Sequence, residues 1–243
     1  MGMKQIKLFS IFFIIPILCG CVTAPKPIAF STHPQENTKI GVLLSEHPKA
    51  GALYTGSVAL LDWGIIEAAN VSLNKHLKTL SFDDDHHLFF EQAEAVLRKR
   101  GYLVEIVNER MPFEFAIKLK THENGITQND YTIYKEKYGL KHLLIVRING
   151  MGTTRPYSGF IPTAPPVATA TIWGELVDLE SKNVLWYQTV TANKVIPEPW
   201  DEKNSGYANL TNSIYSVLND ASKKIFVLLQ YPEAKASLDK HRD

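Results

Sequence analysis

The chain has 243 residues, 45% of them hydrophobic, with 26 basic and 25 acidic side chains. Because these charges almost cancel, the chain has no large net positive charge that would attract nucleic acid or steer acidic substrates. The sequence has two cysteines in all, so we expect an ordinary hydrophobic core in place of a disulfide framework.

Both cysteines lie in the stretch ILCGCV, at the end of an apolar run. A disulfide between Cys19 and Cys21 is sterically poor, and the nearest histidine, His33, stands alone in a proline-rich tract. Lys4 and Lys7 precede an apolar segment, 8–18, that is too short to span a membrane. This pattern is typical of a secretory signal peptide.

The sequence Leu18-Cys19-Gly20-Cys21 resembles the bacterial lipobox. The resemblance implies cleavage before Cys21 and a diacylglycerol, with acyl chains such as palmitate, on its thiol. Val22 follows where an aspartate would retain an enterobacterial lipoprotein in the inner membrane, so the resemblance implies an outer-membrane location facing the periplasm. A conventional cleaved signal and an uncleaved anchor are the alternatives.

We predict four segments from composition and periodicity. Residues 1–20 form the lipoprotein signal peptide, which takes Lys4 and Lys7 away and leaves 24 basic and 25 acidic residues. Residues 21–38 comprise the lipidated Cys21 and a flexible, proline-containing tether. Residues 39–230 form one α/β domain, and residues 231–243 form a polar tail.

The first half of the domain reads as alternating strands and helices. We expect a strand over 39–45, a helix that Ser57 caps and that buries Leu61 and Ile65, and a helix from Asp83 to Arg100 that ends at Gly101. A strand follows over 102–107, and residues 111–120 are compatible with a strand or a short helix.

The second half begins with a helix over 130–138 and a strand over 142–148 whose continuous apolar run predicts cover on both faces. Residues 167–179 and 184–193 flank the turn ESKN and predict a long antiparallel hairpin. We expect Trp173, Val177, Trp186 and Val190 to share one face of it. A final amphipathic helix covers 207–230.

Candidate chemistry is sparse. The cluster DDDHH, residues 83–87, could bind metal, but consecutive helical residues point in different directions, so capping and solvated surface are the preferred interpretation. NGMGTT lacks the third glycine and the helix of a dinucleotide site. HExxH, GxSxG and P-loop motifs do not occur. We therefore predict no catalytic residue, no metal ligand and no cofactor.

Two proline-rich segments, 151–166 and 194–206, are expected to be loops. Their aromatic and apolar side chains could dock on a partner or on the membrane surface, or could fold back over the sheet. The candidate partner-binding residues are Tyr157, Phe160, Ile161 and Trp200.

Three motifs, RKRGYLVEIV, YGLKHLLIVRINGMGT and ATIWGELVDLESKNVLWYQTVTA, together resemble the uncharacterised Neisseria-type envelope lipoproteins and more distantly CsgG, LpoB and PelC. The resemblance covers about residues 39–230. It implies an α/β fold similar to the N-terminal domain of TolB, a single domain with a mixed sheet flanked by helices and a C-terminal helix packed on the sheet. It also implies an accessory role in secretion, export or cell-wall synthesis.

The sequence thus predicts a non-enzymatic lipoprotein, anchored to the membrane through Cys21, that binds an envelope protein partner or self-assembles and does not bind nucleic acid. The rival hypothesis is a lipid-anchored hydrolase or metal-binding enzyme that uses Asp83 to His87, or Asp62, with residues brought near by folding.

Overall fold

The computed structural model describes residues 26–30, 38–82, 85–116, 118–120 and 122–231. The predicted signal peptide, Cys21, Asp83, Asp84 and residues 232–243 lie outside the described residues. No helix among the described residues has the length and apolar character needed to cross a membrane.

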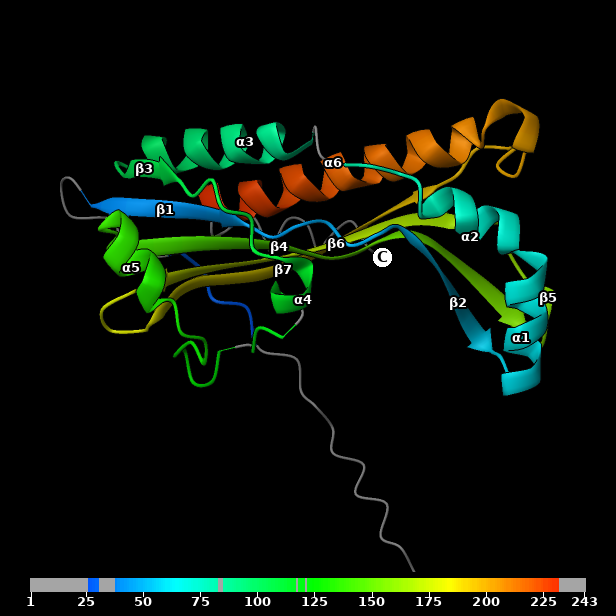
Figure 1. Ribbon diagram of the computed structural model, residues 1–243, viewed down its shortest axis with the longest axis horizontal. Coiled ribbons are helices and arrows are strands. Elements are labelled where there is room, and N and C mark those ends of the chain that lie inside the picture. The colour runs from blue at the N-terminus through cyan, green and yellow to red at the C-terminus, as the bar shows by residue number, and fades with distance from the viewer. Residues whose placement is uncertain (1–25, 31–37, 83–84, 117, 121, 232–243) are drawn as a thin grey trace, which may run out of the picture.

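A mixed seven-stranded sheet organises the domain (Figure 1). Its main path runs β3-β1-β4-β6-β7, while β2 and β5 pair with the far part of β4. The strands are β1 (Lys39–Leu44), β2 (Gly51–Ser57), β3 (Leu103–Ile106), β4 (His142–Ser158), β5 (Ile161–Pro162), β6 (Val167–Asp178) and β7 (Val184–Val195). With its flanking helices, this sheet confirms the predicted single α/β domain.

Two helices cover one face of the sheet, α3 (Asp85–Lys99) and α6 (Ala208–Gln230), as Figure 1 shows. Phe89 of α3 meets Phe226 of α6 at a ring-centroid distance of 6.2 Å. Gly101 follows α3 with φ 91°, the left-handed conformation that its position after the helix predicts. The helices and the sheet enclose the larger hydrophobic cluster, which includes Trp186.

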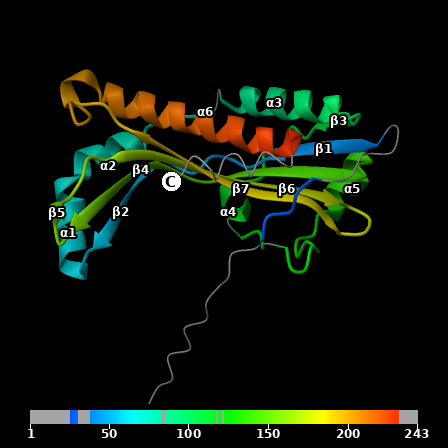
Figure 2. The ribbon, with the colours of Figure 1, turned by 180° about the vertical axis from the view of Figure 1, so that it is seen from behind.

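The opposite face is covered over only part of its length. Two short helices lie on this face: α5 (Thr132–Tyr138) at the end of the sheet where β4 starts, and α4 (Phe113–Ala116) below the middle of the sheet (Figures 1 and 2). Gly139 ends α5 in a left-handed conformation. The second hydrophobic cluster lies on this face and includes Trp173, Leu143 and Tyr187. Segment 111–120 thus contains the short helix of its two predicted alternatives.

The region after β1 differs from the prediction. Residues 51–57 form β2, parallel to β4, and the expected helix is divided into α1 (Leu60–Ala69) and α2 (Val71–Leu77). Ser57 ends a strand and does not cap α1; the Asp62 carboxylate instead accepts the backbone N–H of Ala59 at 3.0 Å. The predicted apolar face was also wrong, because Leu61 and Ile65 are exposed and Ile66 is the buried residue of α1.

The predicted loop at 151–166 is mostly strand. Residues 151–158 continue β4. Its Arg155 lies opposite Tyr54 of β2, and its Thr153 lies opposite Ala168 of β6. Pro156 is accommodated opposite Thr55 of β2, at the far end of the ladder. The prolines suggested a break, but pairing on both edges of β4 overrides that local signal.

The predicted hairpin is present, but its two tryptophans lie on opposite faces. Trp173 and Val177 belong to the cluster on the face that α4 and α5 cover, whereas Trp186 and Val190 belong to the cluster on the face that α3 and α6 cover. The pairs Trp173–Thr189 and Leu176–Trp186 set this register, with a shift after Leu176. Side chains alternate along a strand, so alternation alone left the register open.

Part of the segment predicted as a tether, residues 26–30, packs against the sheet. The backbone of Ile28 donates to and accepts from Tyr187 at 2.9 and 3.0 Å, and Phe30 is 1% exposed. The Arg100 guanidinium lies 4.2 Å from the centroid of the Phe30 ring. Segment 26–30 is therefore part of the folded body.

Two glycines of β4 make a matched test of this strand. At Gly152, φ is +141° and an added Cβ would lie 1.9 Å from the Gly51 carbonyl oxygen, whereas a Cβ at Gly150 would meet no atom within 4 Å. We expect Gly152→Ala to lower the free energy of unfolding by about 3 kcal/mol and Gly150→Ala to change it by less than about 1 kcal/mol. Urea denaturation of both variants checks this; equal effects would contradict the pairing of β2 with β4.

Candidate functional site

An open groove lies on the face of the sheet that α4 and α5 cover in part, which is the lower face in Figure 1, where this helical cover ends. Its volume is about 630 Å³. The walls come from β2, β4, β6, the loop before β2 and α4, and the lining is predominantly apolar. The lining residues are Pro48, Lys49, Gly51, Ala52, Leu53, Phe113, Asn149, Gly150, Met151, Gly152, Thr153, Thr154, Thr169 and Thr171.

Glycine makes the groove deep. Gly51, Gly150 and Gly152 all line it, and a Cβ at Gly51 or Gly150 would project into open space. The groove therefore owes part of its volume to side chains that are missing from two neighbouring strands. A side chain added at Gly150 would occupy that volume without displacing an atom of the protein.

Threonines form the polar part of the lining. The Thr171 hydroxyl pairs with that of Thr191 at 3.1 Å, and the Thr169 hydroxyl accepts from Thr154 at 3.3 Å and donates to Asn193 at 3.0 Å. These cross-strand bonds hold the hydroxyls along the strands and leave methyl groups available to a ligand. Lys49 is the titratable side chain among the lining residues.

Arg147 marks the boundary between the groove and the covered core. Its guanidinium lies 4.6 Å from the centroid of the Trp173 ring and donates to the Asn149 side-chain oxygen at 2.5 Å and to the Ala116 carbonyl. It therefore ties α4 to β4 beside the groove. On β6, the side chain on this face changes from tryptophan at 173 to threonine at 171 as the helical cover ends.

Glu175 lies behind this boundary and is fully buried. Neither carboxylate oxygen has a hydrogen-bond partner among the described residues. Burial raises the pKa of Glu175 to about 7, against the opposing effects of the nearby Thr127 side chain and the positive charge of Arg147. Because Glu175 does not line the groove, its unusual pKa makes it a determinant of stability and gives a ligand no acid or base.

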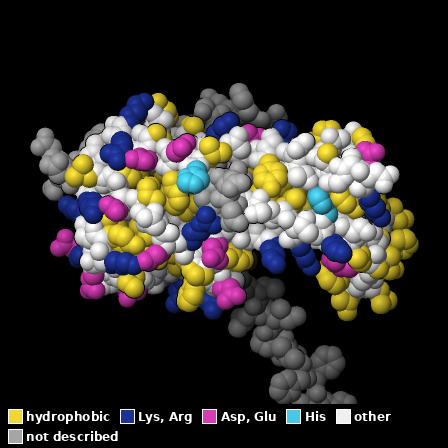
Figure 3. All heavy atoms as spheres, turned by 45° about the horizontal axis from the view of Figure 1, so that its top comes forward, with side chains coloured by type: hydrophobic (Ala, Val, Ile, Leu, Met, Phe, Trp, Pro, Cys, Tyr) yellow, Lys and Arg dark blue, Asp and Glu magenta, His cyan; other side chains and the backbone are white. Residues whose placement is uncertain are grey.

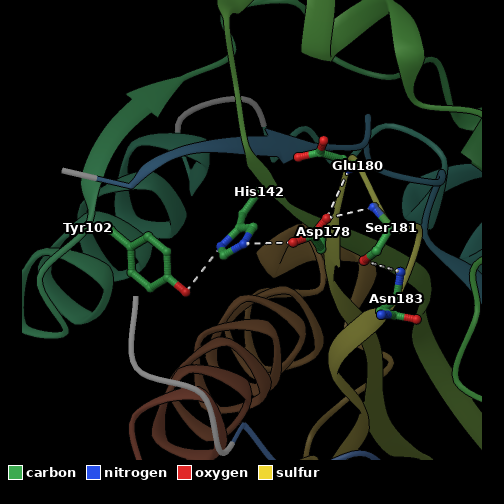
Figure 4. A network of polar contacts seen from close by, with 6 residues as sticks. All are labelled: Tyr102, His142, Asp178, Glu180, Ser181 and Asn183. Atoms are coloured by element: carbon green, nitrogen blue, oxygen red, sulfur yellow. Dashed lines mark hydrogen bonds and ion pairs between the residues drawn. The ribbon is translucent and has the colours of Figure 1, made fainter. Parts of the chain in front are cut away.

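A second polar network joins the far ends of β4 and β6 (Figure 4). His142 lies 3.3 Å from the Tyr102 hydroxyl through Nδ1 and 3.3 Å from Asp178 through Nε2. Burial lowers the pKa of His142 and raises that of Tyr102 to about 12, so both groups are neutral at pH 7. Tyr102 then donates to Nδ1, and Nε2–H donates to the Asp178 carboxylate.

The hydrogen bonds of this network hold the turn between β6 and β7 in place. Asp178 also accepts the backbone N–H groups of Glu180 and Ser181 at 2.9 and 2.8 Å, which fixes the turn between β6 and β7 (Figure 4). Burial alone would raise the pKa of Asp178, but these hydrogen bonds lower it, so the carboxylate remains ionised. His142 is 7% exposed and lies opposite Asp178 in the sheet register.

The candidate residues for the enzyme hypothesis do not converge in the described part of the chain. Asp62 caps α1, His87 is exposed on α3, and nothing is described of the side chains of residues 83–86. Among the described residues, no three histidine, cysteine or carboxylate side chains are grouped so as to hold a metal ion.

The predicted partner-binding residues have different environments. Tyr157 is 5% exposed and packs edge-on against Tyr54, so its side chain is unavailable to a partner. Phe160 and Ile161 are 54% and 60% exposed at the turn between β4 and β5. Trp200 is partly buried beneath the Arg155 guanidinium, 4.8 Å from its ring centroid.

The sequence interpretation missed the groove because it treated Gly150 and Gly152 only as a failed dinucleotide motif. Their spacing of two places both on the same face of a strand, where missing side chains create a hollow. The alternation of Ala168 and Ala170 with Thr169 and Thr171 also indicated a strand with one buried and one polar face.

No family model matches the sequence, and no curated protein matches it. Solved structures similar to this chain include lipoprotein GNA1162 from Neisseria meningitidis (14% identity, covering 75% of this chain and 99% of that chain, TM-score 0.31). They also include the PelC dodecamer from Paraburkholderia phytofirmans (13%, 79% and 92%, 0.31) and a minor lipoprotein from Acinetobacter baumannii (11%, 81% and 94%, 0.34).

The buried carboxyl gives a pH-dependent prediction. The unfolded chain releases the Glu175 proton near pH 4.5 and the folded chain near pH 7, so this group makes the free energy of unfolding fall as pH rises between these values. Glu175→Gln removes the fall. We expect its stability relative to the native protein to rise by on the order of 3 kcal/mol between pH 4.5 and 8.

Urea denaturation at several pH values measures this difference. Glu180→Gln removes the same charge at an exposed position on the adjacent turn and is the matched control. A Glu175→Gln curve parallel to that of the native protein would show that Glu175 does not titrate in this range.

Proposed function

We propose that this protein is a lipid-anchored, non-catalytic lipoprotein of the bacterial outer membrane that faces the periplasm and binds a segment of another envelope protein. The basic residues Lys4 and Lys7, the apolar run and the Leu18-Cys19-Gly20-Cys21 sequence support the anchor. The partner segment would insert an apolar side chain into the groove over Gly150.

The character of the groove is the observation that carries the binding role. Its lining combines Leu53, Met151, Phe113 and threonine methyl groups with Lys49 as the titratable residue. General acid–base or nucleophilic catalysis requires convergent titratable groups, and this lining offers one lysine at an exposed position. An apolar recess floored by backbone is suited to receive an anchor side chain from a partner.

Phe113 and Leu53 give the groove two apolar walls from different elements, α4 and β2. Leu53 is 62% exposed, so a bound segment would bury apolar surface that solvent now contacts. Such burial stabilises a complex by about 25 cal/mol per Å² before the costs of ordering are subtracted. Binding of a partner segment in the groove would therefore bury apolar surface that is exposed to water in the free protein, and this burial favours the complex.

The alternative is a lipid-anchored hydrolase or metal-binding enzyme that uses Asp83 to His87, or Asp62, with residues brought near by folding. It predicts stoichiometric metal in the purified protein, which elemental analysis would detect. Self-assembly is a further possibility, because a second copy could supply the segment that enters the groove; sedimentation of the purified protein would reveal it.

Filling the groove tests the binding role. We expect Gly150→Leu to reduce crosslinking of the lipidated protein to its partner in native envelopes by about tenfold, because the new side chain takes the place of the partner's. Thr189→Leu adds the same side chain on β7, outside the groove, and is the matched control. Mass spectrometry of crosslinked species gives the yield for both.

Thermal melting of both variants separates binding from folding. Unchanged crosslinking of a folded Gly150→Leu protein would overturn the groove assignment. Cys21→Ser should lose the anchor and the crosslink together; partner capture by this form at the native level would show that anchoring is unnecessary.

A further inference from the structure

The end of the molecule around α1 exposes an unusual amount of apolar surface. Leu60 and Leu61, at the start of α1, are 87% and 84% exposed, and Trp63 and Ile65 are each 51% exposed. Ile66 is the buried residue of this ten-residue helix. A surface helix normally turns its apolar side chains toward the core, so α1 has apolar side chains that the fold does not use.

The turn between β4 and β5 continues this surface. The Gly159 N–H donates to the Ser57 carbonyl at 2.8 Å, which places the turn beside the start of α1. A Cβ at Gly159 would lie 3.8 Å from the Asp62 carboxylate. Phe160 and Ile161 follow directly, and we define the apolar end as Leu60, Leu61, Trp63, Ile65, Phe160 and Ile161. Figure 3 shows hydrophobic side chains gathered at this end.

The linker between the predicted lipid on Cys21 and the folded body is short. Ile28 is fixed to Tyr187 by two backbone hydrogen bonds, and the chain from Cys21, which carries the predicted lipid, to Ile28 has seven Cα–Cα steps, with six residues in between. A fully extended chain of this length spans at most about 25 Å. Anchoring through Cys21 would therefore hold the attached face of the body close to the bilayer.

The apolar end lies on the same side of the sheet as this attachment. In Figure 1 the dark-blue segment 26–30 runs below the sheet, and β2, the end of β4 and the start of α1 bend down on that side. Figure 2 shows the same arrangement from behind. Helices α3 and α6 lie on the opposite face, so they would point away from the membrane.

We propose that the apolar end inserts into the interfacial layer of the phospholipid bilayer that carries the Cys21 lipid, as a second membrane contact. This inference rests on the proposed lipid anchor. Because the short linker to Cys21 keeps the bilayer close, even weak partitioning of these side chains brings the apolar end into contact with the bilayer. Leucine and isoleucine favour the acyl region, and tryptophan favours the interface.

The charges on α1 are compatible with a zwitterionic surface. Its two charged residues are Asp62 and Glu67, and it has no lysine or arginine. The Asp62 carboxylate accepts the Ala59 N–H, so its charge is partly compensated at the positive end of the helix. The contact would therefore depend on apolar insertion and not on attraction to anionic lipids.

Brominated acyl chains quench tryptophan that enters a bilayer, and this provides the test. The mature lipidated protein would be reconstituted in phosphatidylcholine and phosphatidylethanolamine vesicles with and without brominated chains. We expect quenching that falls by more than half in Trp63→Phe. Trp200→Phe should retain it, because segment 196–203 lies on the α6 side in Figure 1. The combined Leu60→Ser and Leu61→Ser variant should also lose the quenching, since these exposed residues carry the insertion.

Vesicle flotation separates the possible failures. If the protein floats with vesicles but Trp63 contributes no quenching, the membrane contact is overturned while the lipid anchor stands, and the apolar end is then a candidate protein interface. If the mature protein does not float at all, both the anchor and this inference fail. Normal thermal melting of each variant would show that lost quenching does not reflect unfolding.

Discussion

The pairing of β4 along both of its edges is the constraint on which the structure depends. This 17-residue strand pairs with β1 and then with β2 on one edge, and with β6 over most of its length on the other. Its first half lies between two hydrophobic clusters, and its second half extends beyond the lower helices. Because a strand is rigid along its hydrogen-bonded ladder, this extension carries β2, β5 and α1 away from the main core.

The groove and the apolar end both follow from that extension. Where α4 ends, the lower face of the sheet changes from Trp173 to threonine, and Gly51 and Gly150 leave the surface hollow. Farther along β4, α1 packs through Ile66 and leaves four large apolar side chains outside. The extension thus creates a recess beside α4 and, beyond it, an exposed apolar projection, which the proposed partner and bilayer contacts would use.

Much of the fold was predictable from local patterns, and the exceptions have identifiable causes. Gly101 and Gly139 marked helix ends correctly because left-handed backbone favours glycine. The extension of β4 through Pro156 was missed, since its partner at Pro156 is Thr55 of β2, about 100 residues earlier in the chain. The groove was missed for the same reason, because it requires the register of three strands. Helical periodicity failed for α1, whose apolar residues are distributed around the helix and face mainly outward.

Residues 26–30 determine where the chain that leads back to Cys21 leaves the folded body. Ile28 pairs with the edge strand β7 and Phe30 is buried, so a lipid on Cys21 would restrict both distance and orientation. The most direct test of this account is the intact mass of the protein purified from native envelopes. We predict a chain that begins at Cys21 and carries the mass of a diacylglycerol with attached acyl chains. A chain that retains residues 1–20, or one cleaved elsewhere without lipid, would contradict the account.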